Sequence, residues 1–92
     1  MSLLSKAEIQ KGISDLDGWE YVDGSIKKTF SFDTYMDSIN FINKLAEKAE
    51  EENHHPDLSF GWGYCKIKIF THAIKGLAES DFILAAKIDK II

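Results

Sequence analysis

The sequence has a single cysteine, Cys65, among its 92 residues. One cysteine cannot form an internal disulfide, and Cys65 lies among alternating strand residues, where it most simply serves as a small buried apolar group. A reducing compartment fits this composition best. No stretch approaches the length of a membrane-spanning segment, and residues 1–4 lack the basic start and long apolar run of a signal peptide. We therefore expect no contact with a membrane and a cytoplasmic, or nuclear, location.

The chain also lacks an excess of basic residues. Eleven basic residues against fifteen acidic ones give a net charge of -4, and the two signs are interspersed along the sequence. No electrostatic footprint for nucleic acid is present, so direct binding of DNA or RNA is not expected. An apolar content of 45% is enough for one hydrophobic core. We expect a single domain over residues 1–92, without repeats or linkers.

Proline occurs once, at Pro56, and no glycine or proline interrupts residues 33–53 before it. This stretch is expected to be a long central helix that Pro56 prevents from continuing. Apolar residues recur along it at helical spacing: Tyr35, Ile39, Ile42, Ala46 and Ala49. Phe41 and Leu45 lie beside that stripe on a helical wheel, so the apolar arc is wider than packing on one sheet requires. The extra width predicts a homodimer or homotetramer that packs through the central helix.

Shorter patterns on both sides of the central helix complete the fold prediction. Ser5 and Glu8 have the spacing of a capping box at a first helix, and Asp23-Gly24 suits a tight hairpin turn. Strands are expected over residues 19–22, 26–32, 57–61 and 64–71, and the other two helices over residues 6–14 and 81–92. The order α-β-β-α-β-β-α predicts an α+β fold, a four-stranded antiparallel sheet covered by three helices.

All three histidines lie between Glu50 and Asp81: His54 and His55 at the end of the central helix, and His72 at the end of the last strand. Glu50 and His54 are four residues apart, so we expect the carboxylate to orient the His54 ring. Histidine titrates near neutrality, so one imidazole can donate a proton while another accepts one. This combination suits the elimination of water, which needs an acid at the leaving oxygen and a base at a second atom.

Two other interpretations of the histidines remain open. A histidine at a helix C-terminus is also favoured because its charged form complements the helix dipole. Three histidines and a carboxylate could instead ligate zinc or iron. Adjacent histidines in an extended segment point apart, however, and the common spacing of two ligands on one helix is missing. We therefore expect no metal.

These residues together resemble a known family signature. The series Glu50-x-x-x-His54-His55-Pro56, followed by Trp62, His72 and Asp81, is similar to that of the pterin-4a-carbinolamine dehydratase family. The similarity extends to three more segments: Leu16 to Trp19 (L-x-G-W), Ile26 to Phe32 (I-x-[RK]-x-F-x-F), and Thr71-His72 with Gly76-Leu77 (T-H-x-x-x-G-L). The resemblance thus covers nearly the whole chain.

The resemblance implies an enzyme that dehydrates 4a-hydroxytetrahydropterin to quinonoid dihydropterin in tetrahydrobiopterin recycling. It implies no metal or redox cofactor, and a functional link to an aromatic amino acid hydroxylase. A non-catalytic role, as a pterin-binding protein or as a dimerisation partner and coactivator of transcription factors, is the alternative.

The resemblance also implies roles for individual residues. His54 and His72 match the acid and base, and His55 matches a histidine that mainly holds the substrate. Further residues match supporting or substrate-binding positions: Glu50, Asp81, Thr71 and Trp19. Trp19 is equally well explained as a core tryptophan at a strand start. Trp62 is assigned to a hairpin turn and to packing.

Two residues depart from the family pattern. Ala78 stands where a threonine or serine is common before the last helix, which reduces the expected capping pair to Asp81 alone. Lys75 stands where a small residue, often glycine, is usual. Both departures fall in the loop after His72 and bear on its rigidity and on the rim of the cleft.

Overall fold

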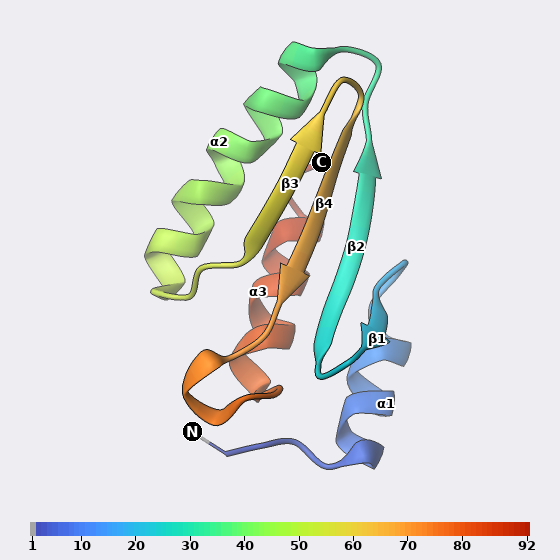
Figure 1. Cartoon of the computed structure of the whole chain (residues 1–92), viewed down its shortest axis with the longest axis vertical. Helices are drawn as coiled ribbons and strands as arrows, with labels where there is room; N and C mark the ends of the chain where they lie inside the picture. Colours follow the sequence, from blue (N-terminus) through green and yellow to red (C-terminus); the bar gives the residue numbers. More distant parts are fainter. Residues whose placement is uncertain (1) are drawn as a thin grey trace.

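The computed structural model describes residues 2–92 and confirms the predicted order of elements. The elements are α1 (Lys6–Asp15), β1 (Glu20–Val22), β2 (Ser25–Ser31), α2 (Tyr35–Glu52), β3 (Asp57–Gly61), β4 (Tyr64–Ile69), a 3₁₀ turn (His72–Ile74) and α3 (Glu79–Asp89). The four strands form one antiparallel sheet in the order β1-β2-β4-β3. In Figure 1 the sheet lies in front of α3, and α2 runs beside β3.

The ends of the helices follow from local side-chain chemistry. At α1 the Ser5 hydroxyl accepts a hydrogen bond from the Glu8 N–H at 3.2 Å, and the Glu8 carboxylate accepts one from the Ser5 N–H at 2.8 Å. The pKa of Glu8 is lowered mainly by the hydrogen bond with the Ser5 backbone and, to a smaller extent, by the one with the Ser5 side chain. At α2 the Thr34 hydroxyl accepts from the Asp37 N–H at 3.1 Å. At each of these two helix starts, a cap side chain thus binds one of the backbone N–H groups that has no partner within the helix.

The core lies between the helices and one face of the sheet. Alternate residues of the central strands point into it, among them Ile26, Phe30, Cys65, Ile67 and Ile69. Cys65 is fully buried as expected, and this burial raises the pKa of its thiol. The opposite face of the sheet, which we call the open face, carries polar and charged side chains. In residues 2–92 no helix is long and apolar enough to cross a membrane.

The predicted orientation of α2 is wrong. Phe41 and Leu45, expected at the margin of the helix, are 4% and 1% exposed and belong to the core of the single chain. The Phe41 ring packs against those of Phe30 and Phe32, with centroids 4.8 and 5.1 Å apart. Tyr35, expected in the core stripe, is instead 46% exposed. A wide apolar arc does not fix which part of it faces the sheet. Here Phe41 packs on Phe30 and Phe32, and Leu45 lies in the same core.

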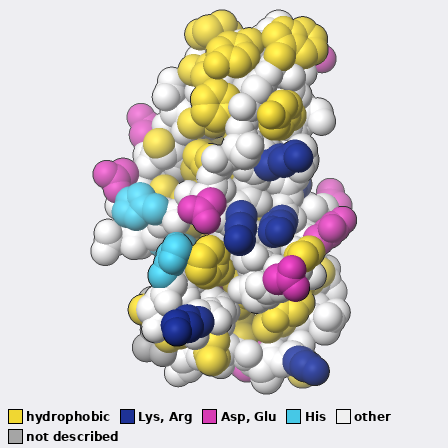
Figure 2. All heavy atoms as spheres, viewed as in Figure 1, with side chains coloured by type: hydrophobic (Ala, Val, Ile, Leu, Met, Phe, Trp, Pro, Cys, Tyr) yellow, Lys and Arg dark blue, Asp and Glu magenta, His cyan; other side chains and the backbone are white. Residues whose placement is uncertain are grey.

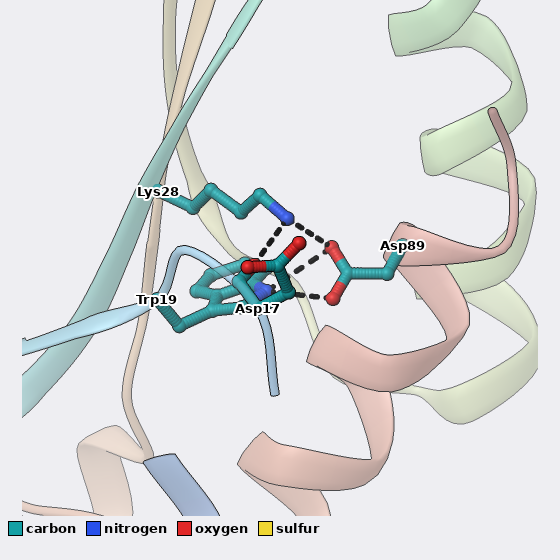
Figure 3. Close-up of polar contacts among 4 residues, drawn as sticks. All are labelled: Asp17, Trp19, Lys28 and Asp89. Carbon is teal, nitrogen blue, oxygen red and sulfur yellow. Dashed lines mark hydrogen bonds and ion pairs between the residues drawn. The ribbon is translucent and has the colours of Figure 1, made fainter. Parts of the chain in front are cut away.

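A polar cluster on the core side was not predicted. Lys28 alternates with Ile26 and Phe30, so its side chain points toward the helices rather than to the open face. Its ammonium donates to the Asp17 carbonyl at 2.6 Å and to Asp89 of α3 at 2.8 Å. Figure 3 shows the Trp19 indole converging on the same carboxylate, to which its Nε1–H donates at 3.0 Å. Trp19 therefore ties the start of β1 to the end of α3, which supports its role as a core residue.

Strand and helix boundaries differ from the prediction mainly around His72. β4 ends at Ile69, and Thr71 forms an isolated bridge with Gly76, so the chain turns through a short 3₁₀ segment. The last helix begins at Glu79 instead of residue 81 and ends at Asp89 instead of residue 92. Trp62 lies in the β3–β4 turn as expected, but its side chain is 73% exposed instead of packed.

Candidate active site

The end of α2 determines where the two adjacent histidines point. Asn53 takes the left-handed conformation (φ 48°, ψ 43°), and its N–H bonds to the carbonyls of Ala49 and Glu50. The next N–H, that of His54, bonds back to the Ala49 carbonyl at 3.0 Å. This is a Schellman-type helix end, and it removes His54 from the helix. The residues after it therefore do not keep helical spacing to Glu50.

The expected pair of Glu50 with His54 is wrong for that reason. Glu50 contacts the Nε2 atom of His55 instead. Both side chains are largely in water, 75% exposed for Glu50 and 57% for His55. An ion pair at such exposure contributes little to stability. Glu50 can orient the His55 ring, but the pair stays accessible to a ligand.

His54 is held by the other predicted carboxylate. Its Nε2 lies 2.5 Å from Oδ1 of Asp81 in the first turn of α3, 27 residues further along the chain. The His54 side chain is 15% exposed, whereas that of Asp81 is fully buried. The sequence indicated both residues but not their contact, because nothing local links the end of α2 to the start of α3.

Asp81 accepts three hydrogen bonds. Besides His54, the Thr71 hydroxyl donates to Oδ2 at 2.8 Å, and so does the Ala78 N–H, also at 2.8 Å. A buried charge is costly unless it is hydrogen-bonded, and the three donors around this carboxylate meet that requirement. Because Asp81 acts as an acceptor throughout, we assign the proton to Nε2 of His54, which leaves Nδ1 as the nitrogen free to exchange a proton.

The third histidine is connected to this pair through the chain. Thr71, whose hydroxyl binds Asp81, directly precedes His72. The His72 ring packs on the ring of Phe70, with centroids 4.1 Å apart. Figure 2 shows histidine side chains gathered at one edge of the open face, with acidic and basic groups beside them. Phe70 was predicted on the same strand face as His72, but its contact with the imidazole was not.

The tertiary structure thus assembles most of the predicted site residues. Asp81 binds both His54 and Thr71, Glu50 binds His55, and His72 follows Thr71 in the chain. Trp19 is the exception, since its indole bonds Asp89. The hydrogen bond from the Ala78 N–H to Asp81 is the half of the expected capping pair that Asp81 supplies. Within residues 2–92 no group of three or more His, Cys, Asp and Glu side chains is arranged to hold a metal ion.

The start of α3 offers a direct test of this geometry. Ala78 is the N-cap residue and has no side-chain acceptor, and its own N–H donates to the Asp81 carboxylate. Ala78→Ser adds a hydroxyl that can accept from the first turn, and serine adds fewer atoms than threonine at a side chain only 2% exposed. We expect the free energy of unfolding to rise by about 1 kcal/mol and the melting temperature by roughly 4–8 °C. Thermal denaturation measures both, and the wild-type alanine is the reference without the hydroxyl. A serine variant no more stable than the wild type would contradict the assignment of Ala78 as the cap.

Comparison with known proteins agrees with the fold and the site. The family model for pterin 4 alpha carbinolamine dehydratase matches residues 2–91. A protein of Rickettsia bellii is 51% identical over 88 residues, which cover 94% of this chain and 78% of that protein. A protein of Rubrobacter xylanophilus is 45% identical over 89 residues, covering 96% and 83%. Both carry the name pterin-4-alpha-carbinolamine dehydratase as a provisional assignment.

Two solved structures share the fold. A transcriptional coactivator/pterin dehydratase from Brucella melitensis superposes with a TM-score of 0.94 at 28% identity, covering 98% of both chains. A pterin dehydratase-like protein identified as a RuBisCO assembly factor in the alpha-carboxysome has a TM-score of 0.66 at 26% identity, covering 79% of this chain and 84% of that one.

The topology, together with a buried carboxylate that holds an imidazole beside two further histidines, defines the class as a pterin dehydratase fold. The chain belongs to the pterin 4 alpha carbinolamine dehydratase family, which places it among the hydro-lyases.

Proposed function

We propose that the protein dehydrates 4a-hydroxytetrahydropterin to quinonoid dihydropterin by general acid–base catalysis with His54 and His72. One imidazole donates a proton to the 4a-hydroxyl, and the C4a–O bond breaks to release water. The N5 lone pair forms the C4a=N5 double bond while the other imidazole removes the N5 proton. The observation that carries this proposal is the buried Asp81, which binds His54 directly and binds Thr71 next to His72.

The two carboxylates support different tasks in this scheme. In the His54–Asp81 pair the carboxylate is fully buried and the imidazole is 15% exposed, so the ring has a fixed orientation and presents Nδ1 for proton transfer. The His55–Glu50 pair is exposed to water, so His55 is better suited to contact the substrate than to transfer a proton. Phe70 beneath His72 limits the orientations of that ring.

An assay of product formation tests the proposal. The carbinolamine is generated by an aromatic amino acid hydroxylase, and the appearance of quinonoid dihydropterin is followed by absorbance against the spontaneous rate. We expect the protein to accelerate dehydration, and pretreatment with a chelator to leave the rate unchanged. Loss of activity on chelation, with recovery on adding zinc or iron, would favour a metal site instead.

The same assay separates the enzyme from a second candidate, a binding protein without catalysis. The names of the two solved relatives include a coactivator and an assembly factor. Large apolar side chains are exposed around α2 and the β3–β4 hairpin, among them Tyr35, Phe60 and Trp62. An intact fold that does not accelerate dehydration would favour this candidate.

We further propose a cytoplasmic location and supply of the carbinolamine by an aromatic amino acid hydroxylase.

We also propose that the protein assembles as a homodimer or homotetramer through α2, by a surface other than the one predicted. Phe41 and Leu45 are inside the core, but Tyr35, Met36 and Ala46 remain exposed on the helix. The apolar surface continues from Tyr35 to Phe60 of the edge strand β3, because their ring centroids lie 6.3 Å apart. A contiguous apolar surface of this kind favours a symmetric contact between copies.

Tyr35→Glu/Ala46→Lys should therefore lower the mass in solution while leaving the fold intact, because both side chains are exposed in the single chain. Light scattering measures the mass and circular dichroism the fold. Gln10→Lys, on the exposed side of α1, is the matched control and should keep the wild-type mass. A double variant of unchanged mass would show that the copies meet elsewhere or that the protein is a monomer.

A further inference from the structure

Three lysines on the open face have no role in the proposed reaction. Lys27 lies directly opposite Lys68 across the β2–β4 pair, and Lys66 lies one row further along, opposite Thr29. Like charges directly opposite each other in a sheet are destabilising. Within the described chain none of the three lysines has an ion pair, although the protein as a whole carries a charge of -4. The lysines are therefore a local concentration of unpaired positive charge.

The acids nearest to them in the sheet do not cancel this charge. Glu20 lies opposite Lys27 on β1, and Asp57 lies opposite Lys68 on β3, so one row across the sheet reads acid, lysine, lysine, acid. Both acids flank the row, and neither lies within ion-pair distance of a lysine. The two ammonium groups at the centre are left facing the solvent together, with Lys66 as a third cation beside them.

The lysines are continuous with the histidine site. Lys68, Phe70 and His72 alternate along one side of the chain, and the extended backbone of Thr71 maintains that alternation. The Lys68 ammonium lies 5.3 Å from the centroid of the Phe70 ring. The centroid of the His72 ring lies 4.1 Å from the same Phe70 centroid. On β3, Asp57 follows His55-Pro56. Figure 2 shows the basic side chains in the middle of this face, close to the histidines.

The surface between these residues is hollowed. A depression of about 290 Å³ is lined by Lys27, Lys68 and Lys66 together with Asp57, Ser59 and Thr29. Four residues of extended chain span about 13 Å, so the distance from Lys68, in β4, to His72, beyond its end, is comparable to a bicyclic ring with a short side chain. A substrate whose ring lies against the histidines can therefore reach the lysines with its side chain.

Building on the proposed function, we propose that the substrate is a pterin with an anionic side chain, such as a phosphate monoester, which Lys68 and Lys27 bind on the open face. Two ammonium groups that repel each other are stabilised by a shared anion, and the flanking hydroxyls of Ser59 and Thr29 can donate hydrogen bonds to it. The subsite acts on specificity, since it lies beyond the atoms that react.

The test compares two 4a-hydroxytetrahydropterins that differ only in a terminal phosphate on the side chain. The wild type should favour the phosphorylated one in kcat/KM by about five- to twentyfold, because each exposed charge pair contributes roughly a two- to fivefold effect. The ratio of the two kcat/KM values should fall two- to fivefold in Lys68→Met. In the double variant Lys27→Met/Lys68→Met it should fall to a value close to one. Methionine keeps the apolar stem over Phe70. Raising the salt concentration should reduce the wild-type ratio in the same direction.

Two control variants sharpen the result. Lys44→Met removes an exposed lysine of α2 outside this face and should leave the ratio unchanged. Asp57→Asn removes the acid opposite Lys68 and should raise the ratio. A wild-type ratio near one, or a preference that survives in the double lysine variant, would overturn the subsite.

Failure of the proposed reaction can be told apart from failure of the subsite. If neither carbinolamine is dehydrated faster than in buffer, the proposed function is wrong. In that case the subsite is tested by measuring the dissociation constants of the stable 7,8-dihydropterins with and without the phosphate. Tighter binding of the phosphorylated form that depends on Lys27 and Lys68 supports the subsite, and equal binding overturns it.

Discussion

Replacing His54 with alanine is expected to lower kcat for carbinolamine dehydration by roughly ten- to a thousandfold, at or just below the usual range for a general acid or base. His72→Ala should have an effect of the same order. His55→Ala should mainly raise KM, because this histidine is exposed and pairs with an exposed carboxylate. Steady-state kinetics on the three variants give both constants. Full activity in all three would remove the histidines from the mechanism.

A matched variant separates chemistry from stability at His54. Alanine leaves Asp81 buried with one of its three donors missing, so the fold is also weakened. His54→Gln supplies an amide N–H that can donate to Asp81 but cannot exchange a proton near neutral pH. We expect the glutamine variant to regain much of the stability lost in the alanine variant and none of the activity. Recovery of activity along with stability would mean that His54 only maintains the fold.

Asp81→Ala is expected to have the largest effect on stability, a loss of about 2–4 kcal/mol in the free energy of unfolding. The carboxylate is fully buried, and its removal leaves the His54 ring, the Thr71 hydroxyl and the Ala78 N–H without their acceptor. Unpaired buried groups of this kind cost about 1–3 kcal/mol each before the structure relaxes. Urea denaturation measures the loss. Glu79→Gln, an acid of the same helix turn that is exposed, should change stability little.

Asp81→Asn tests the positioning of His54 more specifically. All three partners donate to Asp81, but an amide has one accepting oxygen and one donating NH₂ group. If the oxygen keeps Thr71 and Ala78, the NH₂ group faces His54, whose Nε2 must then become the acceptor. We expect near-wild-type folding, a low kcat and a change of tautomer visible in the ¹⁵N chemical shifts of the His54 ring. Unchanged shifts together with a full kcat would show that Asp81 does not set the tautomer.

The sequence by itself determined the order and nature of the elements. Capping at Ser5, the uninterrupted stretch before Pro56 and the two-residue alternation of the strands act over a few residues, so they can be recognised without a structure. The same holds for the burial of Cys65 between alternating apolar residues. The site residues were named by the family signature, which specifies which side chains are present but not what each one contacts.

The tertiary structure alone decided the pairings and the orientation of α2. Glu50 binds His55 because the left-handed Asn53 ends helical spacing one residue before the histidines. Phe41 faces inward and packs on the ring of Phe30 in β2, with Leu45 in the same core, a contact that no periodicity of α2 alone encodes. His54 finds Asp81 across 27 residues because α3 packs beside the end of α2. Local sequence patterns fix local backbone conformation, whereas such contacts arise only when separate elements pack on the same core.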